Sequence, residues 1–569
     1  MGALRIDDFS GGRNTRDAVN LVGKNESPDQ NNCWTENGAL VKRRGFSAVT
    51  SSFDNGAGTD ITFFPEQTFV TNLGAGGTHM LCIIGRITAF ATAIRALITT
   101  VNGTTFLPAG LKTGTSAVTS ATVTGSGTTW NTAGDGKVLA GDLYRVDSDG
   151  EFRQILTVDS DTQLTLTAAY PSNYGAGQAH TIMKRLAVGS PVAMSALNSK
   201  LYISDGTRPV QRYDGTDVRD VVGFPLTKHM RTYKNHIFTW GHSGARSTLS
   251  WSDVNDAETW PAANNQQISP NDSDGSRGIF VYRGSLILFK NRSMYIFTGD
   301  SPFDPVNPTY TIVPLKVPDD FSFYASRAIV THLGVMKFLT EKGWYGYRGG
   351  TELEQIISDI VSADTDAFRR LGPAEEAMQD SPVAFVHNDD MYCCVVDTGQ
   401  SPSSTCNTIF VLDRDGAWWR WYPSGANGFS DFAAVQFSGG SRALIVGDVG
   451  NAELRTADTG SIDDAAAISG YWISREFTYE VEQEFLYAKI WLKKQSAGSL
   501  TVSYSLDRAT FVDFTVSMTA GVGTVVEATI PIQAMGKAIR LKVLNATASQ
   551  TFEVYRMAVV SNDTDGDRE

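Results

Sequence analysis

Three cations stand in a row near the start of an acidic chain. Lys42, Arg43 and Arg44 belong to the stretch NGALVKRRGF, in a sequence of 569 residues whose formal net charge is -13. Ammonium and guanidinium groups form charge-assisted hydrogen bonds with carboxylates and phosphates. We take the three residues as candidates for a binding site. A solvated edge strand, on which Lys and Arg prevent unwanted pairing, explains them at least as well.

Clustered tryptophans could support a second kind of chemistry, the stacking of aromatic rings on sugars. The stretch DGAWWRWYP contains Trp418, Trp419 and Trp421. Indole rings are large and apolar, so packing between neighbouring sheets also explains the cluster. We favour packing.

Closely spaced carboxylates in DSDGE (147–151) could begin a calcium loop, because Ca²⁺ prefers hard oxygen ligands. The ligands end there, however, and Asp-Gly makes a hairpin turn without a metal. The five cysteines include no CxxC pair, which predicts buried free thiols rather than a zinc site. The histidines are scattered singly, and His236 alternates with Phe238 and Trp240, as expected of a core histidine. We predict no metal site and no cofactor.

A search for catalytic motifs finds no HExxH, GxxxxGK[ST], GxSxG or EF-hand pattern in the sequence. WSDVNDAETW (251–260) and YSLDRATF (504–511) are weakly similar to the Asp-box turn, SxDxGxTW, of sialidase-type propellers. Such turns are structural staples even in enzymes. A sialidase would also need an arginine cluster and a Tyr-Glu nucleophile pair. The sequence contains no FRIP-like motif, which would carry the first arginine of that cluster. We predict that the chain is not an enzyme.

The composition is that of an ordinary soluble globular protein, with 41% hydrophobic and 19% charged residues. The acidic balance argues against gripping nucleic acid through its phosphates, yet DNA could slide past a like-charged wall. No apolar run approaches the length of a membrane span, and MGALRIDDFSGG does not read as a secretory signal. We expect synthesis in the cytoplasm.

The elements that must position these residues are strands. Between residues 193 and 458 an apolar strand, a turn with Asp or Gly and an aromatic strand recur, as in LYISDG with VQRYDG and LILFKN with MYIFTG. The units begin roughly 35 to 55 residues apart, close to the spacing of propeller blades. We therefore predict an all-β fold, a β-propeller of six or seven blades with a small inserted β-domain and a C-terminal β-sandwich.

The change in composition along the chain divides it into six parts. We predict an extended N-terminal arm (1–36), a first blade region (37–112), the inserted domain (113–183), the remaining blades (184–460), the sandwich-like domain (461–560) and an acidic flexible tail (561–569). After the Asn37-Gly38 turn, residues 39–46 are expected to form one strand. The best candidate for a short helix is 362–370.

The N-terminal region (7–46) resembles the opening of tail nozzle proteins, the tail tubular protein B-like β-propeller structural proteins of short-tailed bacteriophages. Residues 251–266 and 286–300 look like blade sequence of the same group, and the inserted segment is similar to small β-domains of phage structural proteins. The matching N-terminal pieces are Ser10-Gly11-Gly12, Asn14-Thr15, Glu26-Ser27-Pro28-Asp29, Asn31, Asn37-Gly38-Ala39-Leu40 and Arg43-Arg44-Gly45-Phe46.

This resemblance implies a homohexameric ring in the virion tail, assembled in the host cytoplasm, below the head-to-tail adaptor and near tail fibre or tailspike proteins. Genomic DNA would cross its channel during ejection without sequence-specific binding. Lys42, Arg43 and Arg44 would then pair with acidic groups of a neighbouring subunit or of the adaptor. The alternative is a glycan-binding or glycan-cleaving tail protein with a sialidase-like propeller. A host-encoded propeller scaffold for protein partners is a third hypothesis.

Overall fold

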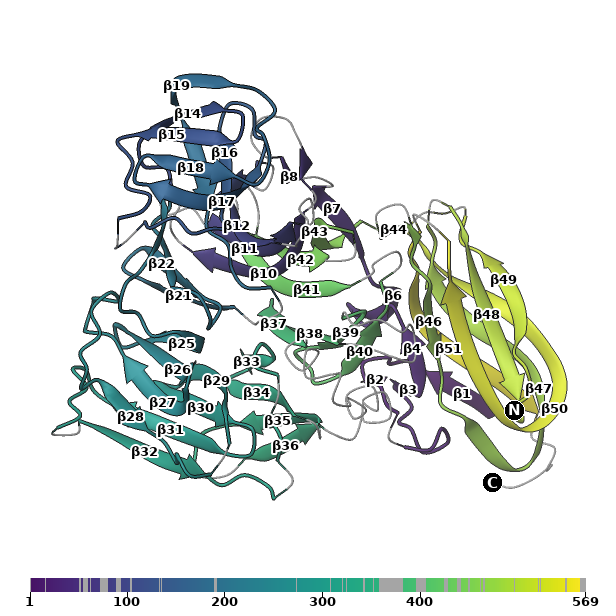
Figure 1. Cartoon of the computed structure of the whole chain (residues 1–569). Helices are drawn as coiled ribbons and strands as arrows, with labels where there is room; N and C mark the ends of the chain where they lie inside the picture. Colours follow the sequence, from purple (N-terminus) through teal and green to yellow (C-terminus); the bar gives the residue numbers. More distant parts are fainter. Residues whose placement is uncertain are drawn as a thin grey trace.

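The computed structural model is built from strands, and the residues it describes contain no helix (Figure 1). It describes residues 2–15, 17–50, 53–54, 60–61, 63–71, 80–87, 94–102, 105–132, 134, 136–188, 192–272, 274–306, 309–319, 321–323, 325–340, 343–350, 353–357, 382–395, 406–423, 428–436, 442–448, 451–460, 462–463, 466–495, 497–519, 521, 523–547 and 550–562. The predicted helix at 362–370 and most of the predicted acidic tail lie outside these residues. Within them, no helix is long and apolar enough to span a membrane.

Six four-stranded sheets and one six-stranded sheet succeed one another around a ring (Figure 1). Innermost strands of neighbouring sheets lie against one another, as β10 does against β41, β41 against β37, and β21 against β25. This arrangement confirms the predicted all-β propeller. The strands are β10 (Phe63–Thr71), β11 (Met80–Ile87), β12 (Ile94–Thr100), β13 (Leu107–Pro108); β21 (Ala193–Leu197), β22 (Lys200–Ser204), β23 (Gln211–Tyr213), β24 (Val218–Asp220); β25 (Thr227–Tyr233), β26 (His236–His242), β27 (Ala245–Trp251), β28 (Asn265–Gln267); β29 (Ser276–Tyr282), β30 (Ser285–Lys290), β31 (Met294–Gly299), β32 (Tyr310–Leu315); β33 (Ile329–His332), β34 (Val335–Thr340), β35 (Gly343–Tyr347), β36 (Glu354–Ile357); β37 (Val383–His387), β38 (Asp390–Val395), β39 (Thr408–Leu412), β40 (Trp418–Trp421), extended by β2 (Gly12–Arg13) and β3 (Glu26–Ser27); and β41 (Phe429–Gln436), β42 (Arg442–Asp448), β43 (Glu453–Thr459), β7 (Gly45–Thr50).

A two-residue turn joins the first two strands of five successive sheets. Both central residues of each turn have positive φ, the backbone of the type I′ hairpin turn, whose twist matches that of the paired strands. The turns are Asn198-Ser199, Lys234-Asn235, Arg283-Gly284, Leu333-Gly334 and Asn388-Asp389. The recurring turn fixes the register of the inner hairpin in each of these blades.

The ring closes through the N-terminal region, because β7 pairs antiparallel with β43 and completes the last sheet. The predicted turn at Asn37-Gly38 is confirmed, with φ of 51° and 77°. The prediction of one strand over 39–46 is wrong. β6 (Ala39–Lys42) belongs to the C-terminal sheet and β7 to the propeller, so the chain passes from one body to the other at Arg43 and Arg44.

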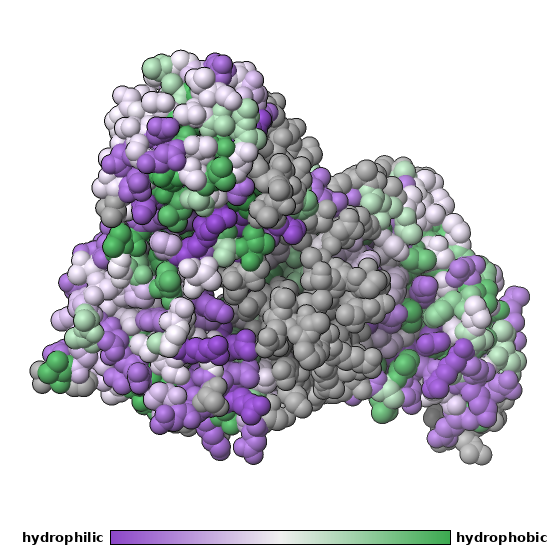
Figure 2. Space-filling view, in the orientation of Figure 1, coloured by the Kyte–Doolittle hydropathy of each residue, from purple (hydrophilic) through white to green (hydrophobic). Residues whose placement is uncertain are grey.

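The inserted segment forms a seven-stranded sheet above the ring in Figure 1. Most of its buried side chains form a cluster of their own, which includes Val118, Trp130, Tyr144 and Leu164. Hydrophilic and hydrophobic side chains are interspersed over this sheet and over the blades below it (Figure 2). The strands are β14 (Thr115–Thr119), β15 (Thr122–Ser126), β16 (Leu143–Val146), β17 (Arg153–Ser160), β18 (Gln163–Leu166), β19 (Tyr174–Gln178) and β20 (His180–Met183).

The C-terminal body is a ten-stranded sheet to which the N-terminal region, residues 2–42, contributes four strands. β1 pairs with β51 and β4 with β46. The β5–β6 hairpin pairs with β51 on the same edge as β1, opposite β47. The strands are β1 (Gly2–Ile6), β4 (Asp29–Asn31), β5 (Cys33–Glu36), β6, β46 (Gly470–Ile473), β47 (Phe477–Lys493), β48 (Ser499–Leu506), β49 (Val512–Ser517), β50 (Val525–Asn545) and β51 (Glu553–Asn562). Two further pairs are β8 (Phe53–Asp54) with β9 (Asp60–Ile61), and β44 (Ile462–Asp463) with β45 (Ala466–Ala467).

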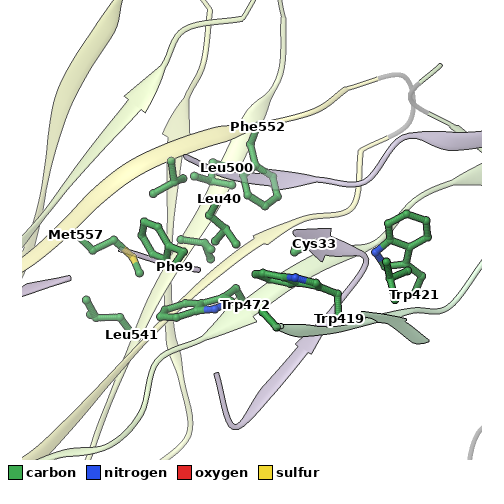
Figure 3. Close-up of a cluster of buried hydrophobic side chains, with 14 of the residues drawn as sticks. Phe9, Cys33, Leu40, Trp419, Trp421, Trp472, Leu500, Leu541, Phe552 and Met557 are labelled. Atoms are coloured by element: carbon green, nitrogen blue, oxygen red, sulfur yellow. The ribbon is translucent and has the colours of Figure 1, made fainter. Parts of the chain in front are cut away.

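One hydrophobic cluster joins this body to the propeller (Figure 3). Phe9 of the arm meets Trp472 of β46 edge to face at 5.2 Å, and Trp419 and Trp421 of β40 belong to the same cluster. Burial of aromatic side chains is a main source of packing energy. The arm is therefore a packed part of the molecule.

Candidate functional site

Lys42, the last residue of β6 in the C-terminal sheet, is buried. Its side chain is 2% exposed, and Nζ donates to Asn545 Oδ1 at 2.7 Å and to the carbonyl oxygens of Ile468 and Thr547 at 3.3 Å. Burial lowers the pKa of this amine from 10.5 to about 8. Lys42 thus satisfies its donors within the chain.

Arg43 forms a fully buried ion pair across the junction between the two bodies. Its Nη1 and Nη2 donate to the two carboxylate oxygens of Asp463 at 2.8 and 2.6 Å, and both side chains are 0% exposed. Nε donates to Asn32 Oδ1 at 2.7 Å, while Asp463 also accepts the backbone N–H of Phe46. A bidentate pair of this kind fixes orientation as well as distance. It holds the start of β7 at the point where that strand enters the propeller.

Arg44 lies at the surface. Its side chain is 53% exposed and faces Glu36 at 3.4 Å. The placement of Lys42 and Arg43 in an interface is corrected, because each has its charge satisfied inside the chain by residues that follow hundreds of positions later. For Arg44 an interface role stays a prediction.

The tryptophans of β40 are packed, as predicted. Trp418, Trp419 and Trp421 are 2%, 0% and 1% exposed. The Trp419 indole N–H donates to Asp413 Oδ2 at 2.8 Å, and Trp421 meets Trp34 of the arm edge to face at 5.7 Å. None of the three rings has a free face for a sugar.

The Asp-box-like stretch at 251–260 joins two blades. Glu258, in the loop after β27, receives Arg212 Nη1 on both oxygens at 2.9 Å and Lys200 Nζ at 2.8 Å. Tyr202 donates to the same carboxylate at 3.2 Å. A Tyr-Glu pair beside an arginine therefore exists, and the sequence search missed it because its members are more than forty residues apart.

The cluster of Glu258, Arg212, Lys200 and Tyr202 links the β21–β24 and β25–β28 sheets. Tyr202 is 2% exposed and stacks on Phe224 at 5.7 Å, and burial together with the neighbouring carboxylate raises the pKa of its hydroxyl. A nucleophile needs a lowered pKa and access to substrate. The second stretch is also structural, since Asp507 Oδ1 accepts the backbone N–H groups of Lys537 and Ala538 at 2.8 Å.

The carboxylates at 147–151 accept hydrogen bonds from residues of the inserted sheet. Asp149 Oδ1 accepts the Tyr170 hydroxyl at 2.7 Å and the Glu151 N–H at 3.0 Å, and Asp147 Oδ1 accepts the Thr181 hydroxyl at 2.7 Å. Across the described ranges, no group of three or more His, Cys, Asp or Glu side chains is placed to hold a metal ion.

The remaining candidates are core residues, as predicted. The five cysteines are free and buried, and burial raises the pKa of Cys33 and Cys82 well above the ordinary thiol value. His236 is 2% exposed, with Nδ1 at 2.7 Å from the Ser252 carbonyl and Nε2 at 2.8 Å from Ser301 Oγ.

Comparison with known proteins finds similarity to solved structures alone. No family model matches the sequence, and no curated protein does. Solved structures similar to the chain include exo-beta-1,3-galactanase from Phanerochaete chrysosporium, at 9% identity over 91% of this chain and 100% of that one, with a TM-score of 0.23. A glycoside hydrolase family 43 arabinoxylan arabinofuranohydrolase from Bacillus subtilis matches at 10% identity over 91% and 99%, with a TM-score of 0.23. BBS1N in complex with ARL6DN matches at 12% identity over 51% and 90%, with a TM-score of 0.30.

The prediction that the chain is not an enzyme is overturned by the glycoside hydrolases among these matches. The search for local motifs could not support it, because catalytic groups from separate segments are recognised by geometry rather than by sequence position. At this identity the likeness shows the fold alone. It assigns neither an activity nor a catalytic residue to this chain.

Proposed function

We propose that the chain is a structural component of the tail of a short-tailed bacteriophage, a ring-forming nozzle below the head-to-tail adaptor that forms part of the channel for DNA ejection. The observation that carries this proposal is the position of the nozzle-like N-terminal residues. They lie in the arm that ties the propeller to the C-terminal sheet.

Three of the nozzle-like pieces make joining contacts. Gly12 pairs with Trp418 of the β40 strand, in a parallel ladder that has no room for a side chain. Ser27 Oγ donates to the Ile473 carbonyl of β46 at 2.7 Å, and Arg43 pairs with Asp463. A chain that must keep two bodies in fixed orientation while DNA passes would need such contacts. The net charge of -13 also suits a wall from which phosphates are repelled.

Ring formation tests the proposal directly. The purified full chain would be imaged by electron microscopy, alone and with tail adaptor from the same particles, and intact particles would be labelled with gold-coupled antibody against the inserted sheet. A ring at the distal tail is expected. A chain that stays monomeric at micromolar concentration and is absent from particles would overturn the nozzle.

Glycan binding or cleavage is the second candidate. The buried tryptophans do not favour it. What supports it is the presence of glycoside hydrolases among the similar solved structures. Incubation of the chain with host surface polysaccharides, followed by a reducing-end assay and a binding array, tests this role. Absence of both release and retention would discard it.

A further inference from the structure

One rim of the propeller carries cations that have no carboxylate to pair with. Neighbouring strands of a blade run antiparallel, so the starts of its first and third strands and the loop after its second strand lie at the rim opposite the type I′ turn. Five cations lie at this rim, over the β21–β24, β25–β28 and β29–β32 sheets, and we call them the basic rim. They are Arg208 between β22 and β23, Lys228 near the start of β25, Arg246 near the start of β27, Arg277 near the start of β29 and Arg292 between β30 and β31.

The basic rim is accessible. Lys228, Arg246 and Arg292 are exposed, and Arg208 and Arg277 are half-buried. Within the part of the chain that the structure describes, none of the five forms an ion pair or donates a side-chain hydrogen bond. Their guanidinium and ammonium groups therefore remain available to an acidic partner.

The carboxylates on the same rim already have partners. Asp220 and Asp272 each receive a buried lysine ammonium, at 3.1 and 2.7 Å, while Asp205 and Asp274 accept backbone N–H groups. The excess of positive charge is felt by His229. Burial, and then the charge of Lys228, lower the pKa of His229 from 6.5 to about 4, and Arg277 acts in the same direction.

The opposite rim carries carboxylates in excess. Asp214 follows β23, Asp253 and Asp256 follow β27, and Asp389 lies in the turn between β37 and β38. All four side chains are exposed, and none of them belongs to an ion pair among the described residues. We call these four residues the acidic rim.

Cations near the acidic rim are engaged elsewhere. Lys200 and Lys234 bind other carboxylates, those of Glu258 and Asp300. Arg283 donates to carbonyl oxygens of the next blade. The two rims of one propeller thus expose unpaired charges of opposite sign.

We propose that the basic rim of one copy of the chain binds the acidic rim of a second copy. The two rims lie on opposite sides of a propeller, so their charges can meet only between molecules. A contact between two different surfaces is heterologous, and it generates a ring when the rotation that it imposes closes. A nucleic acid on the basic rim would leave the acidic rim unmatched, whereas a second copy matches both. The inference rests on the proposed ring-forming function and deepens it, because it names the surfaces that build the ring.

Sedimentation velocity of the full chain at low salt and micromolar concentration tests the contact. Arg246→Glu with Arg292→Glu should weaken self-association about tenfold or more, because like charges then face one another across the contact. Asp253→Asn with Asp256→Asn should weaken it less, since it removes charge and keeps an amide oxygen for the N–H groups that these side chains bind. Lys24→Glu with Lys537→Glu, at two exposed cations outside the propeller, is the matched control and should leave self-association unchanged.

An equimolar mixture of the two rim variants separates a heterologous contact from one between identical surfaces. One variant keeps its acidic rim and the other keeps its basic rim. The mixture should therefore form one-to-one dimers that neither variant forms alone and that do not grow into larger assemblies. Unfolding curves of every variant distinguish lost association from lost folding.

Self-association that survives Arg246→Glu with Arg292→Glu overturns the contact, as does a mixture that stays monomeric or a wild-type chain that is monomeric at low salt. Binding of a duplex oligonucleotide that is lost in Arg246→Glu with Arg292→Glu, while self-association is unchanged, would assign the basic rim to nucleic acid instead. Gold label at the distal tail would keep the nozzle even where the contact fails. A chain that associates through its rims and is absent from particles would keep the contact and remove the nozzle.

Discussion

The propeller carries two further sheets, and the two junctions differ in how their charges are matched. At the C-terminal junction Arg43 and Asp463 pair one to one, both fully buried, inside a hydrophobic cluster that runs from the blades into the C-terminal sheet. At the junction with the inserted sheet Asp142 and Asp220 share Lys184, and the nearby Arg185 and Arg208 form no ion pair or side-chain hydrogen bond with the described residues. The first junction has its charges matched in pairs, whereas the second does not.

Packing follows the same division. The cluster at the C-terminal junction contains residues of the arm, of β40, of β42 and of the C-terminal sheet. The inserted sheet keeps a separate cluster, and Leu143, Phe152 and Met183 are its described residues in the cluster of the first blade. We therefore expect substitutions at the two junctions to differ both in size and in sign.

The largest effect is expected from Arg43→Leu. It leaves Asp463 charged and buried without its counter-ion, which costs about 3–5 kcal/mol of unfolding free energy. Urea unfolding measures the loss. In the double variant Arg43→Leu with Asp463→Leu most of the stability should return, because no lone charge remains. A loss below about 1 kcal/mol in the single variant would mean that the junction is not closed in solution.

A smaller loss is expected where the arm meets β40. Gly12 has a φ of +69°, and a Cβ there would stand 2.5 Å from the Trp418 carbonyl oxygen. Gly12→Ala should cost about 2–3 kcal/mol, from backbone strain and from displacement of the parallel pairing. Gly38→Ala is the matched control. Gly38 has a φ of +77° with no atom within 4 Å, so only the strain of about 1 kcal/mol remains. Equal losses of unfolding free energy in Gly12→Ala and Gly38→Ala would show that the arm is not packed against β40.

The sequence predicted the elements better than their assembly. The recurring strand pairs were visible because the hydrophobic pattern of a blade is local, and Asn37-Gly38 has the residues its turn requires. The division of 39–46 between two sheets was not visible, since it depends on Asp463, 420 positions from Arg43. The turns Lys234-Asn235 and Leu333-Gly334 adopt positive φ because strand pairing imposes it, not because both residues favour it.

For the candidate site residues too, local features could be predicted from the sequence and contacts between distant segments could not. The burial of the β40 tryptophans followed from their apolar size. The contact of Glu258 with Arg212 and Tyr202 joins different blades, and nothing in the separate stretches signals it. Arg185 and Arg208 are a still harder case, because their lack of side-chain hydrogen bonds is recognisable only once their surroundings are known.

At the unmatched junction we expect a substitution that stabilises the protein. Burial, and then the proximity of Asp142, raise the pKa of Asp220 above 3.8, against the attraction of Lys184. A carboxyl with a raised folded-state pKa contributes stability below its unfolded pKa and loses it as the pH rises through the folded value. Asp220→Asn should therefore raise the unfolding free energy at pH 7.5 and change little at pH 3.5.

Asp142→Asn is the control for that comparison. Asp142 accepts two backbone N–H groups besides Lys184, so its replacement should destabilise at pH 7.5. Thermal unfolding at the two pH values measures both variants. If Asp220→Asn destabilises the protein as much as Asp142→Asn does, Lys184 stabilises both carboxylates equally. The charges at this junction would then be matched, against our expectation.

The smallest effect on folding, and the most direct test of the nozzle, is expected from Arg44→Glu. The side chain is half exposed and its pair with Glu36 spans 3.4 Å, so its loss should cost less than about 0.5 kcal/mol. If Arg44 meets acidic groups of a neighbouring subunit, reversal of its charge places like charges across that contact. The ring population measured by light scattering should then fall, more steeply at low salt. Arg414→Glu, at a 74% exposed arginine near the β39–β40 turn, is the matched control. Normal ring formation in Arg44→Glu would remove Arg44 from the interface, and with it the last of the three cations that the sequence had offered for that role.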